Sequence, residues 1–435
     1  MNVKAQFLKG DINENGTIDI EDITMLIDYY LETDGSKDSI DIDNYDLSPK
    51  AVISHFCQLP VMEIITPNGD DITNRRDYMD DVEITLYDSN GEILIKSTAQ
   101  VRGRGNTSWS HFPKKSYKIK FNKKQSLFGE PKDKTWVLLA NYNDKTALRN
   151  DLAFWMGRKL SNLDYTSSSH FIGLILNDKF LGLYQVAEQV KIAPYRVNVE
   201  EDGFLMEIDA RATDEDVHFS IPHCHYPIVI KDQSTDVLNK ADSAYCAQFV
   251  NTVDSVLFSF NYTDTEEGYA KYLDTDSFVD WMLINEIAKN NDAIFYSSCY
   301  MSLARGGKLK MGPLWDFDIA WGNVNYNDND SPEGLWIGEK TIWFQRLLKD
   351  RNFVNKTKER FEHFYSNKEN IIDRIDSQSR LLRNPAYINN KIWKTFGTYV
   401  WPNPVWYDTY EEEVDYLKSW ILKRLEWLKE YYGNL

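Results

Sequence analysis

The sequence predicts an α+β fold, in which a small all-α calcium-loop module precedes a larger domain of two lobes. Three observations support this prediction. Regularly spaced oxygen ligands lie near the N-terminus, β-like segments follow from Leu59, and amphipathic helical patterns dominate from Ile342 to the end. The expected boundaries are 1–57 for the module and 58–435 for the main domain, with an N-terminal lobe at about 58–260 and a C-terminal lobe at about 261–435.

The length, net charge and cysteine pattern of the chain restrict the classes of partner and cofactor that it can have. A chain of 435 residues is long enough for two or three domains with a large core. Its 49 basic and 67 acidic residues leave a net charge of −18, and no basic block offsets it, which argues against nucleic acid or an anionic membrane as partner. No apolar run reaches the roughly 18 residues that a membrane helix needs. The four cysteines are scattered and show neither metal spacing nor a disulfide framework.

The first element is a calcium loop over residues 11–22. Oxygen-bearing side chains stand at loop positions 1, 3 and 5, glycine takes the sharp turn at position 6, and a backbone carbonyl serves position 7. A carboxylate closes the loop at position 12, and a helical pattern follows over 23–31. The expected ligands are Asp11, Asn13, Asn15, Thr17 and Asp22.

No periodic helix precedes this loop, and position 12 is Asp where an EF-hand has Glu. The loop-then-helix form resembles the dockerin module of cellulosomal proteins, which carries two such repeats. Here the second repeat is degenerate, because Thr33, Gly35 and Lys37 would fill its early ligand positions. The resemblance implies bound Ca²⁺ and a cohesin partner on a scaffoldin. The alternative is a calcium-stabilised cap without a partner.

The second element is a strand-rich region with a basic, glycine-containing stretch. Strands are predicted over 61–65, 82–87 and 99–102, and Arg102–Trp109 then leads into a Lys-bearing strand at 113–121. Glycines allow a close backbone approach to a ligand, and arginines and lysines suit phosphates. The alternative is a solvated basic turn.

The third element is the pair Asp316 and Asp318. Side chains two apart on a strand share a face, so both carboxylates are expected at the mouth of one strand, where they would suit Mg²⁺ with nucleotide phosphates. Asp292 lies 24 residues before Asp316, and strand, glycine turn and strand are predicted between them. Folding of this hairpin should bring Asp292 within about 10 Å of the pair, a span that one metal–phosphate site can share. A pair that caps loops or binds a structural ion, or the two carboxylates of a glycoside hydrolase, remain alternatives.

Taken together, the motifs resemble the CotH family of spore-coat-type protein kinases over about Leu59 to Leu435. They are Arg102–Trp109, Lys114–Tyr117, Trp136–Asp144, Leu148–Asn150, Gly182–Glu188 and Trp315–Asp318 with Gly322–Asn323. The resemblance implies an atypical two-lobed kinase fold, ATP with Mg²⁺ or Mn²⁺ as cofactors, and transfer of phosphate to Ser or Thr of secreted or coat proteins.

The resemblance also implies site roles. Asp292 matches the catalytic-loop Asp, and Asp316, with Asp318 beside it, matches the metal-binding Asp. The chain lacks a Gly-x-Gly-x-x-Gly loop and a His-Arg-Asp triplet. The expected nucleotide-binding residues are Arg102, Arg104, Lys115 and Glu188, the last either paired with the lysine or at the adenine hinge. Lys118 and Lys120 share the strand of Lys115 on its opposite face, and the sequence does not settle which face meets ATP.

These expectations combine into a secreted or cell-surface bacterial protein kinase, tethered by its N-terminal module. No signal peptide is recognisable, so either none exists or it was removed. Two other functions remain open. One is a catalytically inactive kinase-like component of a cellulosome-type assembly, and the other is a glycoside hydrolase.

Overall fold

The computed structural model describes residues 59–200, 202–213, 216–233 and 240–434. The predicted module 1–57 and its calcium ligands lie outside the described residues. Within the described ranges, no helix is both long and apolar enough to cross a membrane.

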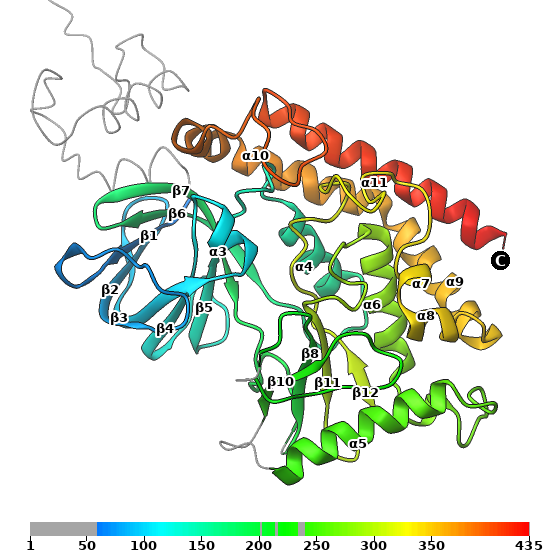
Figure 1. Ribbon diagram of the computed structural model, residues 1–435. Helices are drawn as coiled ribbons and strands as arrows, with labels where there is room; N and C mark the ends of the chain where they lie inside the picture. The colour runs from blue at the N-terminus through cyan, green and yellow to red at the C-terminus, as the bar shows by residue number, and fades with distance from the viewer. Residues whose placement is uncertain (1–58, 201, 214–215, 234–239, 435) are drawn as a thin grey trace, which may run out of the picture.

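The first body is a closed barrel of seven strands in the order β1-β2-β3-β4-β5-β7-β6 (Figure 1). Neighbouring strands are antiparallel, except that β1 pairs with β6 in parallel and thereby closes the barrel. The turn between the last two strands uses Asn177 and Asp178, both with positive φ, as a tight hairpin turn requires. The strands are β1 (Val61–Ile65), β2 (Met79–Tyr87), β3 (Ile93–Arg104), β4 (Ser116–Gln125), β5 (Asp133–Leu139), β6 (Ser169–Leu176) and β7 (Lys179–Glu188), with η1 (Pro67–Gly69) and α3 (Thr107–His111) in the connections.

The two faces of the barrel strands differ in polarity. Val101 on β3 and Ile119 on β4 are fully buried inside the barrel, where Trp136 fills the centre. Arg102 and Lys118 alternate with them and are register partners on the outer face. The barrel therefore carries basic side chains on an outer surface.

The second body is a five-stranded sheet in the order β12-β11-β8-β10-β9. Its strands are β8 (Phe204–Ile208), β9 (His218–Phe219), β10 (Ile228–Gln233), β11 (Cys299–Leu303) and β12 (Leu309–Met311). Strands from before and after residue 260, the predicted lobe boundary, thus share one sheet. β11 begins only at Cys299, because Phe295 and Ser298 adopt left-handed conformations in the turn before it.

Helices form the rest, and α9, α10 and α11 lie on the side away from the second sheet (Figure 1). α6 is buried on all sides, and α11 begins at a capping box of Thr409 and Glu412. The predicted aromatic stripes, including Trp343 and Trp420, lie in the core. The helices are α4 (Arg149–Lys159), α5 (Lys240–Leu257), η2 (Tyr269–Lys271), α6 (Thr275–Ala288), α7 (Ile337–Lys340), α8 (Ile342–Leu347), α9 (Arg351–Ser366), α10 (Lys368–Trp393) and α11 (Tyr410–Gly433).

Two buried cations hold the segment that follows α6 and the loop that faces it. Arg424 on α11 forms an ion pair with Glu286 on α6 at 2.6 Å, and Glu286 also accepts hydrogen bonds from the backbone N–H groups of Trp336 and Gly338. Lys289, which ends α6 in a left-handed conformation, donates to the carbonyl oxygens of Asp328, Ser331 and Glu333 at 2.8–2.9 Å. These contacts fix the position of the residues that lead into Asp292.

Candidate functional site

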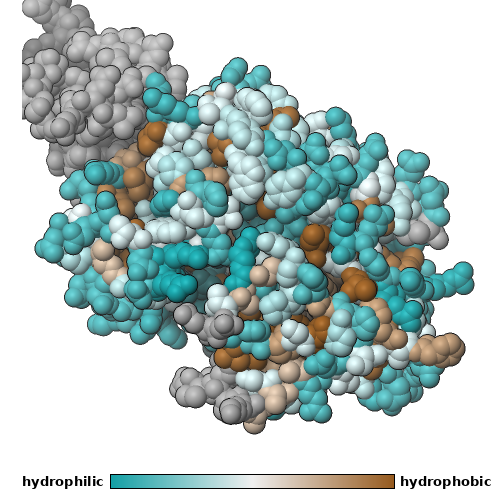
Figure 2. Space-filling model, in the orientation of Figure 1, coloured by the Kyte–Doolittle hydropathy of each residue, from teal (hydrophilic) through white to brown (hydrophobic). Residues whose placement is uncertain are grey.

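A cavity of about 910 Å³ lies between the outer face of the barrel and the second sheet. Hydrophilic residues gather beside it on the face shown in Figure 2. Its lining contains two sets of opposite charge. The acidic set is Glu207, Asp209, Asp216, Asp292, Asp316 and Asp318, and the basic set is Arg75, Arg76, Arg102, Arg104, Arg211 and Lys231.

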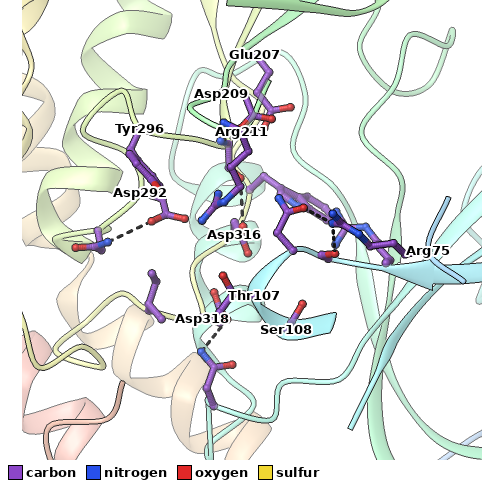
Figure 3. A pocket seen from close by; sticks show the side chains of 18 of the residues that line it. Arg75, Thr107, Ser108, Glu207, Asp209, Arg211, Asp292, Tyr296, Asp316 and Asp318 are labelled. Carbon is purple, nitrogen blue, oxygen red and sulfur yellow. Dashed lines mark hydrogen bonds between the residues drawn. The ribbon is translucent and has the colours of Figure 1, made fainter. Parts of the chain in front are cut away.

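The cavity brings together the three aspartates predicted from the sequence (Figure 3). Asp292 comes from the turn after α6, and Asp316 and Asp318 come from the segment after β12. This segment is not a strand, because β12 ends at Met311 and Asp316 has a φ of 67°. The pair therefore reaches the cavity through an irregular backbone rather than through the alternation of a strand.

Asp292 and Asp318 are buried carboxylates beside a third acidic group. Burial first, and then the charge of Asp316, raises the pKa of Asp292 to about 6, although the Arg211 guanidinium opposes the shift. Burial first, and then Asp316 again, raises the pKa of Asp318 to about 8. Hydrogen bonds hold both groups in place, from Asn291 and Ser297 to Asp292 and from Asn143 to Asp318 at 2.8 Å.

The described residues contain no group of three or more His, Cys, Asp or Glu side chains arranged to hold a metal ion. Magnesium in a nucleotide site needs fewer protein ligands, since one or two carboxylates act together with phosphate and water oxygens. Asp316 and Asp318 fit this role. Their mutual repulsion disfavours two charges in a buried place, and a divalent cation between them would remove that cost.

The basic side of the cavity also holds like charges close together, and here the charges are positive. Arg102 and Arg104 project from the outer face of β3, and Lys118 is the register partner of Arg102 on β4. Burial first, and then repulsion by Arg102, Arg104, Lys191 and Lys231, lowers the pKa of Lys118 to about 8. A cluster of cations that repel one another is suited to an anion with several charges.

Lys115 lies outside this cavity, which corrects its predicted contact with phosphate. Its ammonium donates to the carbonyl oxygens of Trp109 and Phe112, and its side chain lines a separate pocket beside Tyr184. The sequence left two faces of the strand open, and the pairing of Arg102 with Lys118 decides between them. Lys118, not Lys115, shares the basic outer face.

Glu188 also has partners other than the predicted lysine. Its carboxylate accepts hydrogen bonds from the Tyr165 hydroxyl at 3.1 Å and the Ser168 backbone N–H at 3.0 Å, and it lies 3.6 Å from Arg196. Burial is the main cause of its raised pKa. Glu188 thus fastens the end of β7 to residues 165–168, while the ammonium of Lys115 binds the carbonyls of Trp109 and Phe112. The nucleotide-binding role of Glu188 stays a prediction.

Sequence analysis missed several charged residues of the cavity. Arg211 donates to the Ser297 hydroxyl at 2.8 Å and lies over the ring of Tyr296, and Lys231 pairs with Glu207 at 3.0 Å. Arg211 follows closely on the buried strand β8, and that position is the signal that could have placed it in a site.

Comparison with known proteins adds one match. The family model described as CotH kinase protein matches residues 101–428, which include Arg102 and Arg104 at the end of β3, the whole of β4 and all three aspartates of the cavity. No curated protein matches the chain.

Proposed function

The chain belongs to the CotH kinase protein family, and from this premise we propose that it transfers phosphate from ATP, with Mg²⁺ or Mn²⁺, to Ser or Thr side chains of proteins. The observation that carries the proposal is the pair of opposed charge clusters in one cavity. On one side burial and Asp316 raise the pKa of Asp318 to about 8. On the other side Arg102 and Arg104 line the cavity, and burial and their charges lower the pKa of the neighbouring Lys118 to about 8. A metal–triphosphate complex would supply positive charge beside the aspartates and negative charge beside the basic residues.

The residues take distinct roles in this proposal. Asp316 and Asp318 would hold the metal ion, and Arg102 and Arg104 would neutralise the phosphates, with Lys118 adding positive charge beside them. When bound, the metal supplies positive charge to the phosphate oxygens. Asp292, held by Asn291 and Ser297, would orient the acceptor hydroxyl and accept its proton. Positioning and charge neutralisation account for most of the rate in phosphoryl transfer.

The direct experiment is incubation of the purified chain with γ-labelled ATP, Mg²⁺ or Mn²⁺, and a mixture of acceptor proteins. Label in phosphoserine or phosphothreonine, including those of the chain itself, supports the proposal. If calorimetry detects no nucleotide binding, the result supports the alternative of an inactive kinase-like binding component. Release of reducing sugar from glucans without label in protein supports the glycoside hydrolase instead.

We also propose that the protein is secreted or displayed on the cell surface, where the segment 1–57 tethers it to a cohesin-like partner. The support is the calcium-loop pattern at 11–22. Calorimetry with Ca²⁺ on the intact chain tests the ion site, and an unchanged signal in Asp11→Ala contradicts it. Cohesin modules that do not bind in the presence of calcium would contradict the tether.

Substitution of Arg104 and substitution of Lys115 should have different effects on nucleotide binding. Arg104→Met removes a charge that can bind phosphate directly, so the Kd for a non-hydrolysable ATP analogue should rise about tenfold. Lys115→Met is the matched control, because its ammonium is bound to two carbonyls outside the cavity. Its Kd should stay within about twofold of the wild-type value. Calorimetry with the magnesium complex gives both constants, and a larger effect at Lys115 would contradict the assignment.

Phosphoryl transfer should fall in acid through the titration of Asp292. Its pKa is raised to about 6, so the carboxylate is ionised above this pH and protonated below it, where it can no longer accept a proton. Turnover should therefore fall as the pH drops through the pKa. Since the Arg211 charge lowers that pKa, Arg211→Met should move the acid limb to higher pH. The exposed Arg383→Met should not move it, and an identical midpoint in all three proteins would contradict the role of Asp292.

A further inference from the structure

Two aromatic rings, Tyr326 and Trp401, form a rim at one end of the cavity. Their ring centroids lie 6.2 Å apart and their planes differ by 21°, so the rings are stacked. Tyr326 belongs to the segment after Asp318, and Trp401 belongs to the connection between α10 and α11. Trp401 also lies 6.3 Å from the ring of His111 on α3, so the rim joins the barrel to the helical part.

The rim lies at the Asp292 end of the cavity. The side-chain amide of Asn291, which donates to Asp292, also reaches the Tyr326 hydroxyl at 3.5 Å. Burial and then the charges of Asp292 and Asp318 raise the pKa of Tyr326 to about 12. The phosphate-binding cations have other neighbours, since Arg104 lies over the ring of Trp315. The rim therefore adjoins Asp292, beside which the acceptor hydroxyl would lie.

Packing alone does not account for the exposure of Trp401. Its side chain is 44% exposed, although tryptophan has a large apolar surface that usually lies in a core or an interface. One face of its ring is covered by Tyr326, and the remainder borders an open cavity. Aromatic rings of this kind accept the ring of a proline in an extended peptide, whose conformation is already restricted and costs little entropy to bind.

We propose that Tyr326 and Trp401 receive a proline ring next to the accepting Ser or Thr, so that the rim selects extended, proline-containing segments of protein substrates. The inference rests on the proposed function, because it assigns the acceptor class of the same site. Bound in this way, the peptide places its hydroxyl beside Asp292. Tyr326 and Trp401 are then positioning residues that act on acceptor binding and not on the phosphoryl group.

The test uses two fluorescein-labelled peptides, one with a single serine between prolines and one with alanines in place of both prolines. Fluorescence polarisation gives the Kd of each peptide without any turnover, and labelled ATP gives kcat and KM. The intact wild-type chain should bind the proline peptide about tenfold more tightly, as expected for one well-packed ring contact. Trp401→Ala should remove this preference and raise KM about tenfold with little change in kcat, and Trp401→Phe should largely restore it.

Trp406→Ala is the matched control, because Trp406 lies in the same connection, is 48% exposed and is not among the residues that line the cavity. Equal effects of Trp401→Ala on the Kd of both peptides would overturn the inference. So would weaker binding of the ATP analogue by Trp401→Ala without a higher KM for the proline peptide. Binding of a cellulose oligosaccharide that depends on Trp401, without a preference between the peptides, would overturn it in favour of a sugar. Absence of phosphoryl transfer in the wild type contradicts the proposed function alone, since polarisation still tests the rim.

Discussion

Asp316→Asn is expected to lower phosphoryl transfer by about a thousandfold or more, a loss typical of removing one charge-stabilising group from a transition state. Asparagine keeps the size of the side chain and can still accept the hydrogen bond that the Ser298 hydroxyl donates to Asp316 at 3.2 Å. It also tolerates the φ of 67° at this position, which alanine would occupy with strain. The loss of activity would then reflect the missing charge and not a disturbed backbone. Labelled ATP in the presence of Mn²⁺ measures the rate.

The control for this substitution is Asp373→Asn, which removes an exposed carboxylate from α10. Both variants should have the circular dichroism spectrum and melting temperature of the wild type, or a slightly higher melting temperature for Asp316→Asn because repulsion within the acidic cluster falls. Equal incorporation of label by Asp316→Asn and wild type would exclude the catalytic function proposed for this cavity.

Arg424→Met is expected to lower the free energy of unfolding by about 3–5 kcal/mol, the usual cost when a buried ion pair loses one partner. Arg424 is fully buried, and its guanidinium binds Glu286 and the carbonyl oxygens of Pro332 and Gly334. Without it, the Glu286 carboxylate stays in the core without its counterion, and two carbonyls lose their donor. Urea unfolding followed by tryptophan fluorescence gives the difference.

Two further variants make this measurement specific. Glu286→Gln added to Arg424→Met removes the uncompensated charge, so the double variant should recover part of the lost stability. Lys271→Met breaks an exposed ion pair with Glu267 and should leave the unfolding midpoint unchanged. If Arg424→Met shifts the midpoint no more than Lys271→Met does, the buried pair is not a stabilising element of this fold.

Local patterns predicted many elements of the fold, but not how the sheets assemble. The strand at 61–65 and the Lys-bearing strand near 113–121 were predicted from the sequence, and the structure has β1 at Val61–Ile65 and β4 at Ser116–Gln125. The closure of the barrel depends on parallel pairing between β1 and β6, which are more than 100 residues apart. The second sheet likewise joins β8 to β11 across a long helical insertion. Such pairings depend on tertiary contacts, which cannot be inferred from hydrophobic periodicity and residue propensity along the chain.

The acidic half of the site was more predictable than the basic half. Asp292, Asp316 and Asp318 lie at the two ends of one local hairpin, so short-range geometry brought them together. The choice between Lys115 and Lys118 depended on which face of β4 met the cavity, and only the packing of the barrel against the second sheet determines that. Arg211 and Trp401 come from irregular segments, where no periodicity indicates the direction of a side chain.

The contacts of Lys289 bear on how the activity could be controlled in time. Its ammonium fixes the loop of residues 328–333, which follows the segment that carries Asp316 and Asp318. Moving this loop would leave a buried cation and three carbonyls without partners, at a cost of about 3 kcal/mol or more, so fewer than about one molecule in a hundred would be in a second state. A second state this rare becomes populated only when a partner or a modification stabilises it by several kcal/mol relative to the first. We therefore expect the rate of phosphoryl transfer to depend on the concentrations of nucleotide and protein substrate, without a separate inactive conformation that must first be activated.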